Sequence, residues 1–331
     1  MTAAPAPACE RAPGDNEMRL TRRQMLRTAA SAGAAVLLGG RSAVERVLGA
    51  VGRTFPAILQ RPIPSTGELL PAVGIGTARR YDVGTSAAER ASLMEVLRAF
   101  PELGGKVIDT APSYGAAEVV VGDLVQELGN REELFLATKV RADGRQAGID
   151  QMQESLRRLH TDRIDLMQVH NLVDTETQLA TMREWKEAGR IRYVGITTSS
   201  NRQHETFEDV MRSEELDFVQ LNYSLANRQA EQRLLPLAAD RGIAVLINLP
   251  FGRGRLFRAV GDRPLPGWTA EFDCESWAQF FLKFLLANDA VTCVIPGTAK
   301  MEYLVDNVGA ARGRLPDEEL RARMVEFFDA L

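Results

Sequence analysis

The sequence predicts an α/β protein built as a closed (β/α)8 TIM barrel, and three observations predict it. Short apolar runs alternate with segments whose apolar residues recur every three or four positions, and this alternation continues along residues 57–331. There are eight such runs, which is the number that a closed barrel needs. The first run is not followed by the glycine-rich turn that is usual in a doubly wound sheet.

The eight apolar runs are the expected strands. They are residues 71–77, 106–111, 134–140, 165–171, 192–198, 218–224, 244–250 and 291–298. Helical spacing appears between them, for example at Leu93, Val96, Leu97 and Phe100, and again at Leu179, Met182 and Trp185. Glycines that can adopt the left-handed conformation of a helix end follow helix-like segments at Gly104, Gly129, Gly189 and Gly242.

The segment ahead of the first strand predicts a β-hairpin. It reads AILQRPIPSTGELLPAVG over residues 57–74, and its expected turn contains Ser65, Thr66, Gly67 and Glu68. We expect this hairpin to plug the lower end of the barrel and a helix to end the chain. A single barrel domain over residues 57–331 follows.

Residues 1–56 have a different composition. TRRQMLR at 21–27 places Arg22 and Arg23 ahead of an apolar run of small residues at 28–40. That run is too short to span a bilayer stably and is typical of a signal-peptide core. The segment resembles a twin-arginine (Tat) export signal, although a surface helix with a basic start is the alternative. We therefore expect a signal peptide and linker, cleavage between about residues 40 and 57, transient contact with the Tat translocase, and a periplasmic location.

The charge balance and the cysteines exclude several classes of function. The 331 residues include 40 Lys and Arg against 44 Asp and Glu, so there is no basic field for nucleic acid or an anionic membrane. Cys9, Cys274 and Cys293 form no disulfide framework and lack the close spacing of a zinc site. We expect no metal centre and no stable membrane span.

Polar side chains stand at the ends of three neighbouring expected strands. Asp109 and Tyr114 lie in VIDTAPSYG at 107–115, Lys139 ends the next strand and His170 ends the one after it. Each alone has a structural explanation, such as a capping aspartate or a core tyrosine. A barrel builds its active site at the carboxyl ends of its strands, so all four together predict a catalytic site.

These residue types suit carbonyl reduction. A free tyrosine has a pKa of about 10, and a nearby ammonium such as that of Lys139 would lower it toward neutrality. Asp109 would supply the counter-charge to Lys139, and His170 would align a carbonyl that Tyr114 protonates. Since no side chain can supply a hydride, a nicotinamide cofactor is implied.

Two other functions remain open at this point. Lys139 could instead form a Schiff base in an aldolase. Alternatively, the chain could be a nucleotide-binding subunit that senses redox state without turnover.

The motifs IDTAPSYG, ATKV, LMQVHN, FVQLNYS and VIPGTAKMEYLVDN resemble those of the aldo-keto reductases, in order, from residue 70 to about 312. The resemblance implies a barrel that binds NADP(H), with NAD(H) possible, in an extended pose without a Rossmann fingerprint. It also implies that Asp109, Tyr114, Lys139 and His170 are the catalytic tetrad of a carbonyl reductase.

The same resemblance implies the cofactor contacts. Asn171, Thr197, Thr198 and Gln220 fall where the family holds the nicotinamide carboxamide, with Thr197 and Thr198 in place of the usual Ser-Asn pair. Asn248 stands where many members have an aromatic that stacks on the nicotinamide. The remaining expected contacts are Gly76, Thr77, Pro250, Phe251, Gly252, Arg253, Gly254, Arg255, Gly297, Thr298, Lys300, Asp306 and Asn307.

The expected phosphate site departs from the family pattern. Gly297 and Tyr303 occupy positions where many members carry a lysine and an arginine for the 2′-phosphate. Lys300 either replaces the lost charge or is only solvated. Arg253 or Arg255 would add positive charge, because the loops after strands seven and eight are the usual phosphate site of such barrels.

The long segment 251–276 and the start of the next helix carry large aromatic residues. Trp268, Phe272 and Trp277 either line the substrate pocket or belong to the core.

Overall fold

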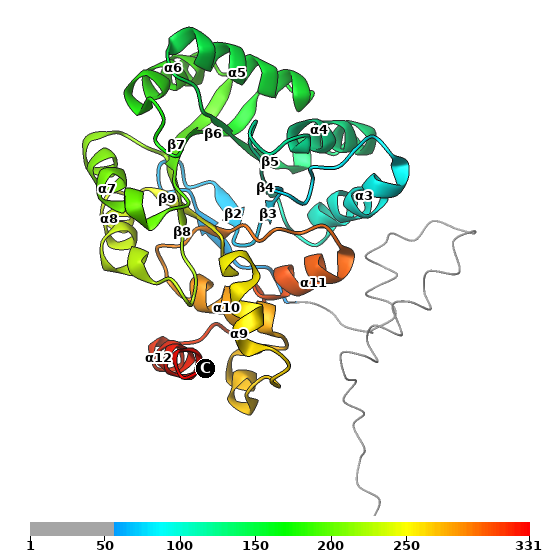
Figure 1. Ribbon diagram of the computed structural model, residues 1–331, viewed down its shortest axis with the longest axis vertical. Helices are drawn as coiled ribbons and strands as arrows, with labels where there is room; N and C mark the ends of the chain where they lie inside the picture. Colours follow the sequence, from blue (N-terminus) through cyan, green and yellow to red (C-terminus); the bar gives the residue numbers. More distant parts are fainter. Residues whose placement is uncertain (1–55) are drawn as a thin grey trace, which may run out of the picture. The chain divides into compact units, whose positions relative to one another are not determined.

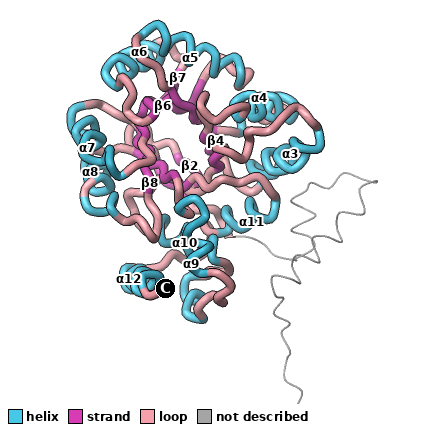
Figure 2. Tube along the Cα trace, viewed as in Figure 1, coloured by secondary structure: helices cyan, strands magenta, loops and turns pink. Residues whose placement is uncertain are grey.

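The structure, a computed structural model, describes residues 56–331, and these form a ring of strands inside a ring of helices (Figures 1 and 2). Eight strands form one sheet in the order β3 to β10, and every neighbouring pair in it is parallel. They are β3 (Ile75–Gly76), β4 (Val107–Asp109), β5 (Phe135–Val140), β6 (Ile164–His170), β7 (Ile191–Thr197), β8 (Phe218–Asn222), β9 (Ala244–Asn248) and β10 (Cys293–Val294). Parallel bridges from Val73 to Val294 and from Gly76 to Gly297 join the first strand to the last. The predicted (β/α)8 barrel is therefore confirmed, whereas the predicted export signal lies outside the described residues.

Glycine lets the two edge strands close the barrel. A Cβ atom on Gly76 would lie 2.8 Å from the backbone oxygen of Ile295, a distance that no side chain tolerates. Gly74 N–H donates to the Val294 carbonyl at 2.8 Å across the same seam. The next residue, Thr77, is fully buried and donates its hydroxyl to the Asp109 carbonyl at 3.0 Å. Gly76 thus lets the seam close, and Thr77 joins the end of β3 to Asp109 on β4.

The helices pack around the strands by the faces that their spacing predicts. Residues Leu93, Val96, Leu97 and Phe100 are buried on the first of them, and Leu179, Met182 and Trp185 on another. The helices are α3 (Ala87–Glu102), α4 (Ala117–Leu128), α5 (Arg145–Arg158), α6 (Thr175–Glu187), α7 (His204–Ser213), α8 (Leu234–Asp240), α9 (Arg255–Val260), α10 (Trp277–Leu286), α11 (Met301–Gly309) and α12 (Glu318–Asp329). Within residues 56–331, no helix has the length and apolar character needed to cross a membrane.

A hairpin closes the amino-terminal end of the barrel, as predicted. Its antiparallel strands are β1 (Gln60–Pro62) and β2 (Leu69–Pro71). Ile63 and Leu70 are fully buried in a cluster with the first residues of several barrel strands. Glu68 in the turn accepts a hydrogen bond from the Tyr193 hydroxyl at 2.6 Å, which ties the hairpin to β7.

The predicted carboxyl-terminal helix is α12, and aromatic rings join it to α10. The ring centroids of Trp268 and Trp277 lie 6.4 and 6.0 Å from that of Phe327 on α12. Phe272 packs on both Trp268 and Phe280. These aromatic residues therefore pack between helices, which favours the core interpretation over pocket lining.

Candidate active site

The structure brings the four predicted tetrad residues together at the carboxyl ends of β4, β5 and β6. Asp109 ends β4, Tyr114 lies in the turn after it, Lys139 is the last residue but one of β5, and His170 ends β6. The Lys139 Nζ atom lies 5.1 Å from the centroid of the Tyr114 ring, and the Tyr114 and His170 ring centroids are 6.0 Å apart. Neighbouring strands thus aim these groups at one another.

Lys139 forms a buried ion pair with Asp109. Its Nζ atom donates to both carboxylate oxygens, at 2.8 and 2.7 Å, and to the Thr110 carbonyl at 2.7 Å. Lys139 is fully buried and Asp109 is only 3% exposed. The ammonium therefore has three oxygen acceptors from Asp109 and Thr110, and the counter-charge that we expect from the sequence is present.

Two glutamine side chains complete the environment of the carboxylate. Gln220 and Gln168 donate to Asp109 Oδ1 at 2.7 and 3.3 Å, and the Gln220 carbonyl accepts from Thr197 at 3.0 Å. Gln220, predicted to hold the cofactor, is thus engaged with the tetrad. Sequence reasoning missed Gln168, although its position two residues before His170 on a strand places both side chains on one face.

Tyr114 keeps its proton more firmly than the sequence suggested. Burial raises the pKa of its phenol, the nearby Lys139 charge lowers it, and Asp109 raises it again, with a net rise. The expected net lowering is wrong because desolvation of the phenolate outweighs the lysine. Near neutral pH the phenol is therefore protonated, which is the form that a general acid needs.

His170 is a neutral imidazole at ordinary pH. Burial, and then the charges of Lys139 and Arg141, lower its pKa from 6.5 to about 3. Its Nδ1 atom lies 3.5 Å from the Ser113 hydroxyl. A neutral ring has one N–H to donate, so His170 can orient a carbonyl oxygen without adding charge.

The predicted carboxamide site is ordered by its own hydrogen bonds. Thr198 donates its hydroxyl to Gln203 at 2.7 Å, and the Thr198 carbonyl accepts from the Asn248 side chain at 2.9 Å. Gln203, which sequence reasoning missed, also donates to the Asn171 carbonyl at 2.9 Å. The Asn248 Oδ1 atom is buried and has no partner among residues 56–331. One amide acceptor is therefore available beside the strand ends.

The loop after β9 is held in a left-handed conformation. Its predicted cofactor residues are Pro250, Phe251, Gly252, Arg253, Gly254 and Arg255. Gly252 and Gly254 have φ of +54° and +80°, which glycine adopts freely, whereas Arg253 has φ of +57°, which costs energy for a side-chain residue. Arg255 Nε donates to the Gly252 carbonyl at 3.1 Å, and the ring centroids of Phe251 and Phe257 are 4.9 Å apart. The residues on both sides of Arg253 are thus held by a hydrogen bond and a ring contact.

Three of the predicted phosphate and adenine contacts hold α11 in position. Thr298 donates to the Pro296 carbonyl and accepts from Asn307, both at 3.0 Å. Asp306 accepts from the Ser276 hydroxyl at 2.7 Å, so its carboxylate binds the start of α10. These residues therefore shape the loop after β10 from within.

Near this loop the structure places one cation in addition to those predicted. Lys300 is exposed, 3.9 Å from a Glu302 oxygen and 5.7 Å from the Tyr303 ring centroid. At Gly297, a Cβ atom would lie 3.5 Å from Arg80 Cγ. The side chain of Arg80, which follows β3 and which sequence reasoning missed, therefore lies beside Gly297.

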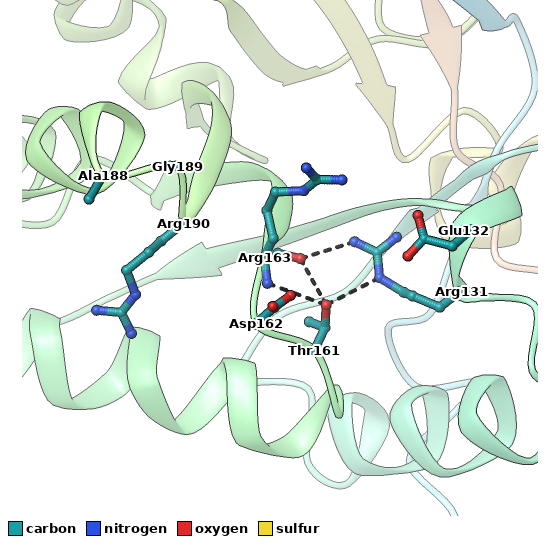
Figure 3. Close-up of a pocket in the computed structure, with 8 residues that line it drawn as sticks. All are labelled: Arg131, Glu132, Thr161, Asp162, Arg163, Ala188, Gly189 and Arg190. Atoms are coloured by element: carbon teal, nitrogen blue, oxygen red, sulfur yellow. Dashed lines mark hydrogen bonds between the residues drawn. The ribbon is translucent and has the colours of Figure 1, made fainter.

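A polar pocket of about 450 Å³ lies at the other end of the barrel (Figure 3). It is lined by Arg131, Glu132, Thr161, Asp162, Arg163, Ala188, Gly189 and Arg190. These residues precede β5, β6 and β7, whereas the tetrad lies at the carboxyl ends of its strands or just after them. Arg131 donates to the Thr161 hydroxyl at 3.4 Å and to the Arg163 carbonyl at 3.0 Å (Figure 3). The pocket is therefore separate from the tetrad.

The fold and the tetrad together define a barrel enzyme that can deliver a proton to a carbonyl oxygen. A family model described as the aldo/keto reductase family matches residues 72–324. The chain therefore belongs to the aldo/keto reductase family, and it is an NAD(P)H-dependent oxidoreductase that reduces carbonyl compounds.

Individual relatives agree with this family. Methylglyoxal reductase YeaE of Escherichia coli is 31% identical over 269 residues, which cover 79% of this chain and 93% of the relative. Aldo-keto reductase YhdN of Bacillus subtilis is 34% identical over 209 residues, which span 59% of this chain and 62% of that protein. The crystal structure of an aldo-keto reductase from Klebsiella pneumoniae in complex with NADPH is 26% identical, with a TM-score of 0.70, and the match covers 82% of this chain and 96% of that one.

Proposed function

We propose that Tyr114 is the general acid of the reduction, supported by Lys139, Asp109 and His170. The observation that carries the proposal is the buried pair of Lys139 and Asp109, whose ammonium lies 5.1 Å from the centroid of the Tyr114 ring. His170 donates a hydrogen bond to the substrate carbonyl oxygen, and Tyr114 gives that oxygen its proton as the alcohol forms. When bound, the nicotinamide supplies the hydride that the carbonyl carbon receives.

The unpaired groups at the strand ends fit a dinucleotide. Buried polar atoms without a partner among residues 56–331 include Asn248 Oδ1, Gln168 Oε1 and Thr110 Oγ1. The Asn248 oxygen can accept a hydrogen bond from a carboxamide. Arg80 and Arg253 are cations that can hold phosphate. Asn171, Thr197 and Thr198 then shape the carboxamide end of the site.

NADP(H) is the cofactor that we propose, in preference to NAD(H). A 2′-phosphate dianion would gain charge-assisted hydrogen bonds from cations near the loop after β10, namely Lys300 and Arg80. The Klebsiella pneumoniae relative binds NADPH. Dissociation constants of both nucleotides for wild type, Lys300→Ala and Arg80→Ala test this. The preference for NADP(H) should fall in at least one variant, and an unchanged ratio in both would refute these phosphate roles.

Turnover with a panel of carbonyl compounds tests the proposed function. The panel should hold aldehydes, ketones, sugars, quinone-like carbonyls and methylglyoxal, each with NADPH and NADH. We expect reduction of at least one member with NADPH. A folded, nucleotide-binding protein without any turnover would instead favour a redox-sensing subunit.

The aldolase alternative is disfavoured by the state of Lys139. Burial alone would lower the pKa of its ammonium, but attraction to Asp109 and Tyr114 prevails and raises it. A charged amine that donates to a buried carboxylate is a poor nucleophile. Borohydride reduction in the presence of substrate should leave no covalent adduct on Lys139.

We also propose that the chain is exported by the twin-arginine route, folded and carrying its nucleotide. The support is the Arg22 and Arg23 pair ahead of residues 28–40, which lies outside the described residues. Bound nucleotide stabilises the folded state, which keeps the precursor competent for this route. Lysine at both positions should retain the precursor in the cytoplasm with its leader uncleaved. Normal export of that variant would contradict the proposal.

A further inference from the structure

Arg141 stands beside the tetrad but takes no part in it. It follows β5 directly, and the register of β5 against β6 pairs Lys139 with Gln168 and Val140 with Val169. One step further, this register places Arg141 opposite His170. Partners in a parallel pair share a face of the sheet, and so do residues two apart on one strand. Lys139 and Gln168 both reach Asp109 inside the barrel, so Arg141 and His170 form the next layer toward the open end.

The backbone of Arg141 is fixed while its side chain is free. Its N–H donates to Gln151 Oε1 at 2.5 Å, and its carbonyl accepts from Gln151 Nε2 at 3.3 Å. The side chain is exposed, and no carboxylate among residues 56–331 pairs with it. By contrast, Arg145 at the start of α5 pairs with Glu184 at 2.6 Å. Arg141 is thus a placed cation without a protein partner.

The acidic residues of the surrounding loops form no ion pair with this cation. Asp174, in the neighbouring loop, accepts from the Gly144 N–H at 2.7 Å. Asp143 forms no ion pair with Arg141. The charge of Arg141 is close enough to contribute to the lowered pKa of His170. A positive charge therefore acts on the place where the carbonyl binds.

We propose that Arg141 binds an anionic group of the carbonyl substrate, so that the preferred substrates are aldehydes or ketones that carry a carboxylate or a phosphate. The inference rests on the proposed function, because His170 marks where the carbonyl oxygen lies. The planar guanidinium offers paired donors that match the oxygens of either anion. Binding of that group would hold the carbonyl near Tyr114 and His170.

The test uses matched substrates that differ in charge at a distance from the aldehyde. They are 4-carboxybenzaldehyde, 4-formylphenyl phosphate and, as the uncharged control, methyl 4-formylbenzoate, each assayed with NADPH. The enzymes are wild type, Arg141→Gln and Arg141→Lys. Arg163→Gln is the matched control, because it removes an exposed arginine at the other end of the barrel.

Wild type should reduce one or both anionic substrates with a higher kcat/KM than the ester. The better of the two shows whether the bound group is a carboxylate or a phosphate. Arg141→Gln should lower kcat/KM for that substrate by about tenfold, mainly through KM, and change the value for the ester by less than about twofold. Arg141→Lys should retain part of the preference, and Arg163→Gln should retain all of it.

Three outcomes would overturn the inference. Equal losses for charged and uncharged substrates in Arg141→Gln, together with a shifted pH profile, would show that Arg141 acts through His170. Reduction of all three substrates with no preference for the anions would refute the substrate class alone. Reduction of none by a wild type that binds NADPH would count against the proposed function as well.

Discussion

Asp109 organises the site at the scale of single residues. Its carboxylate accepts from the Lys139 ammonium and from the amides of Gln168 and Gln220. A carboxylate buried to this degree is stable only when charge and hydrogen bonds compensate for its lost hydration. The same contacts fix Lys139 beside Tyr114. The ion pair therefore both stabilises the fold and positions the lysine next to the proposed general acid.

Breaking the pair on one side should be more costly than removing it whole. Lys139→Met leaves a buried carboxylate uncompensated and should lower the free energy of unfolding by about 3–5 kcal/mol. Adding Asp109→Asn should recover part of that loss, because no unpaired charge remains. Urea unfolding of the single and double variants measures this. Strictly additive costs would contradict the account, and Arg145→Met in the exposed pair with Glu184 serves as the control that changes little.

The neutral state of His170 predicts a pH dependence of stability. Its folded-state pKa of about 3 lies below the ordinary 6.5, so between these values the unfolded chain binds a proton that the folded chain does not. Stability should therefore fall as pH drops through this window, by at most about 1.4 kcal/mol for each pH unit. His170→Gln should lose less stability than wild type over the same window. Parallel stability curves for the two proteins would show that His170 titrates normally.

At the scale of elements, the two ends of the barrel are separated by task. The carboxyl ends of β4, β5 and β6 carry the tetrad, whereas the β1 and β2 hairpin covers the amino-terminal ends. Leu70 in β2 is fully buried there, but its neighbour Leu69 is 52% exposed. The hairpin should thus contribute to stability and not to chemistry.

A pair of leucine variants tests this separation. Leu70→Ala should lower the free energy of unfolding by about 2–5 kcal/mol, since it leaves a cavity in the plug. Leu69→Ala should change it by less than about 0.5 kcal/mol because that side chain faces solvent. Both should keep wild-type kcat below their unfolding temperatures. A large loss of kcat in folded Leu70→Ala would show that the plug and the site are coupled.

The elements could be predicted because their signals are local. Apolar runs and helical spacing mark strands and helices, and the hairpin turn with Gly67 follows from its residues. The short extent of β3 and β10 could not be predicted. These two strands meet at the seam, where isolated bridges such as Gly76 to Gly297 take the place of a continuous ladder. Which strands meet there is decided by the closed sheet and not by either segment.

At the scale of the whole molecule, the sequence predicts where the candidate site lies but not how burial and nearby charges combine to set the pKa of Tyr114. The tetrad follows from strand order, because neighbouring parallel strands end side by side. The net rise in the pKa of Tyr114 depends on how much of the barrel covers it, and the sequence does not state that burial. The hydrogen bond from Gln220 to Asp109 and the contact of Arg80 with Gly297 likewise join segments that are distant along the chain, so neither could be predicted from local sequence.

Turnover by Tyr114→Phe tests the central claim most directly. The variant keeps the ring and loses only the transferable proton, so folding and NADPH binding should persist while kcat for carbonyl reduction falls by about 10² to 10⁴. Tyr81→Phe is the matched control, because Tyr81 is fully buried and its hydroxyl has no partner among residues 56–331. That control should reduce carbonyls at the wild-type rate. A Tyr114→Phe enzyme that keeps more than about a third of wild-type kcat, with chemistry limiting the rate, would show that Tyr114 is not the general acid.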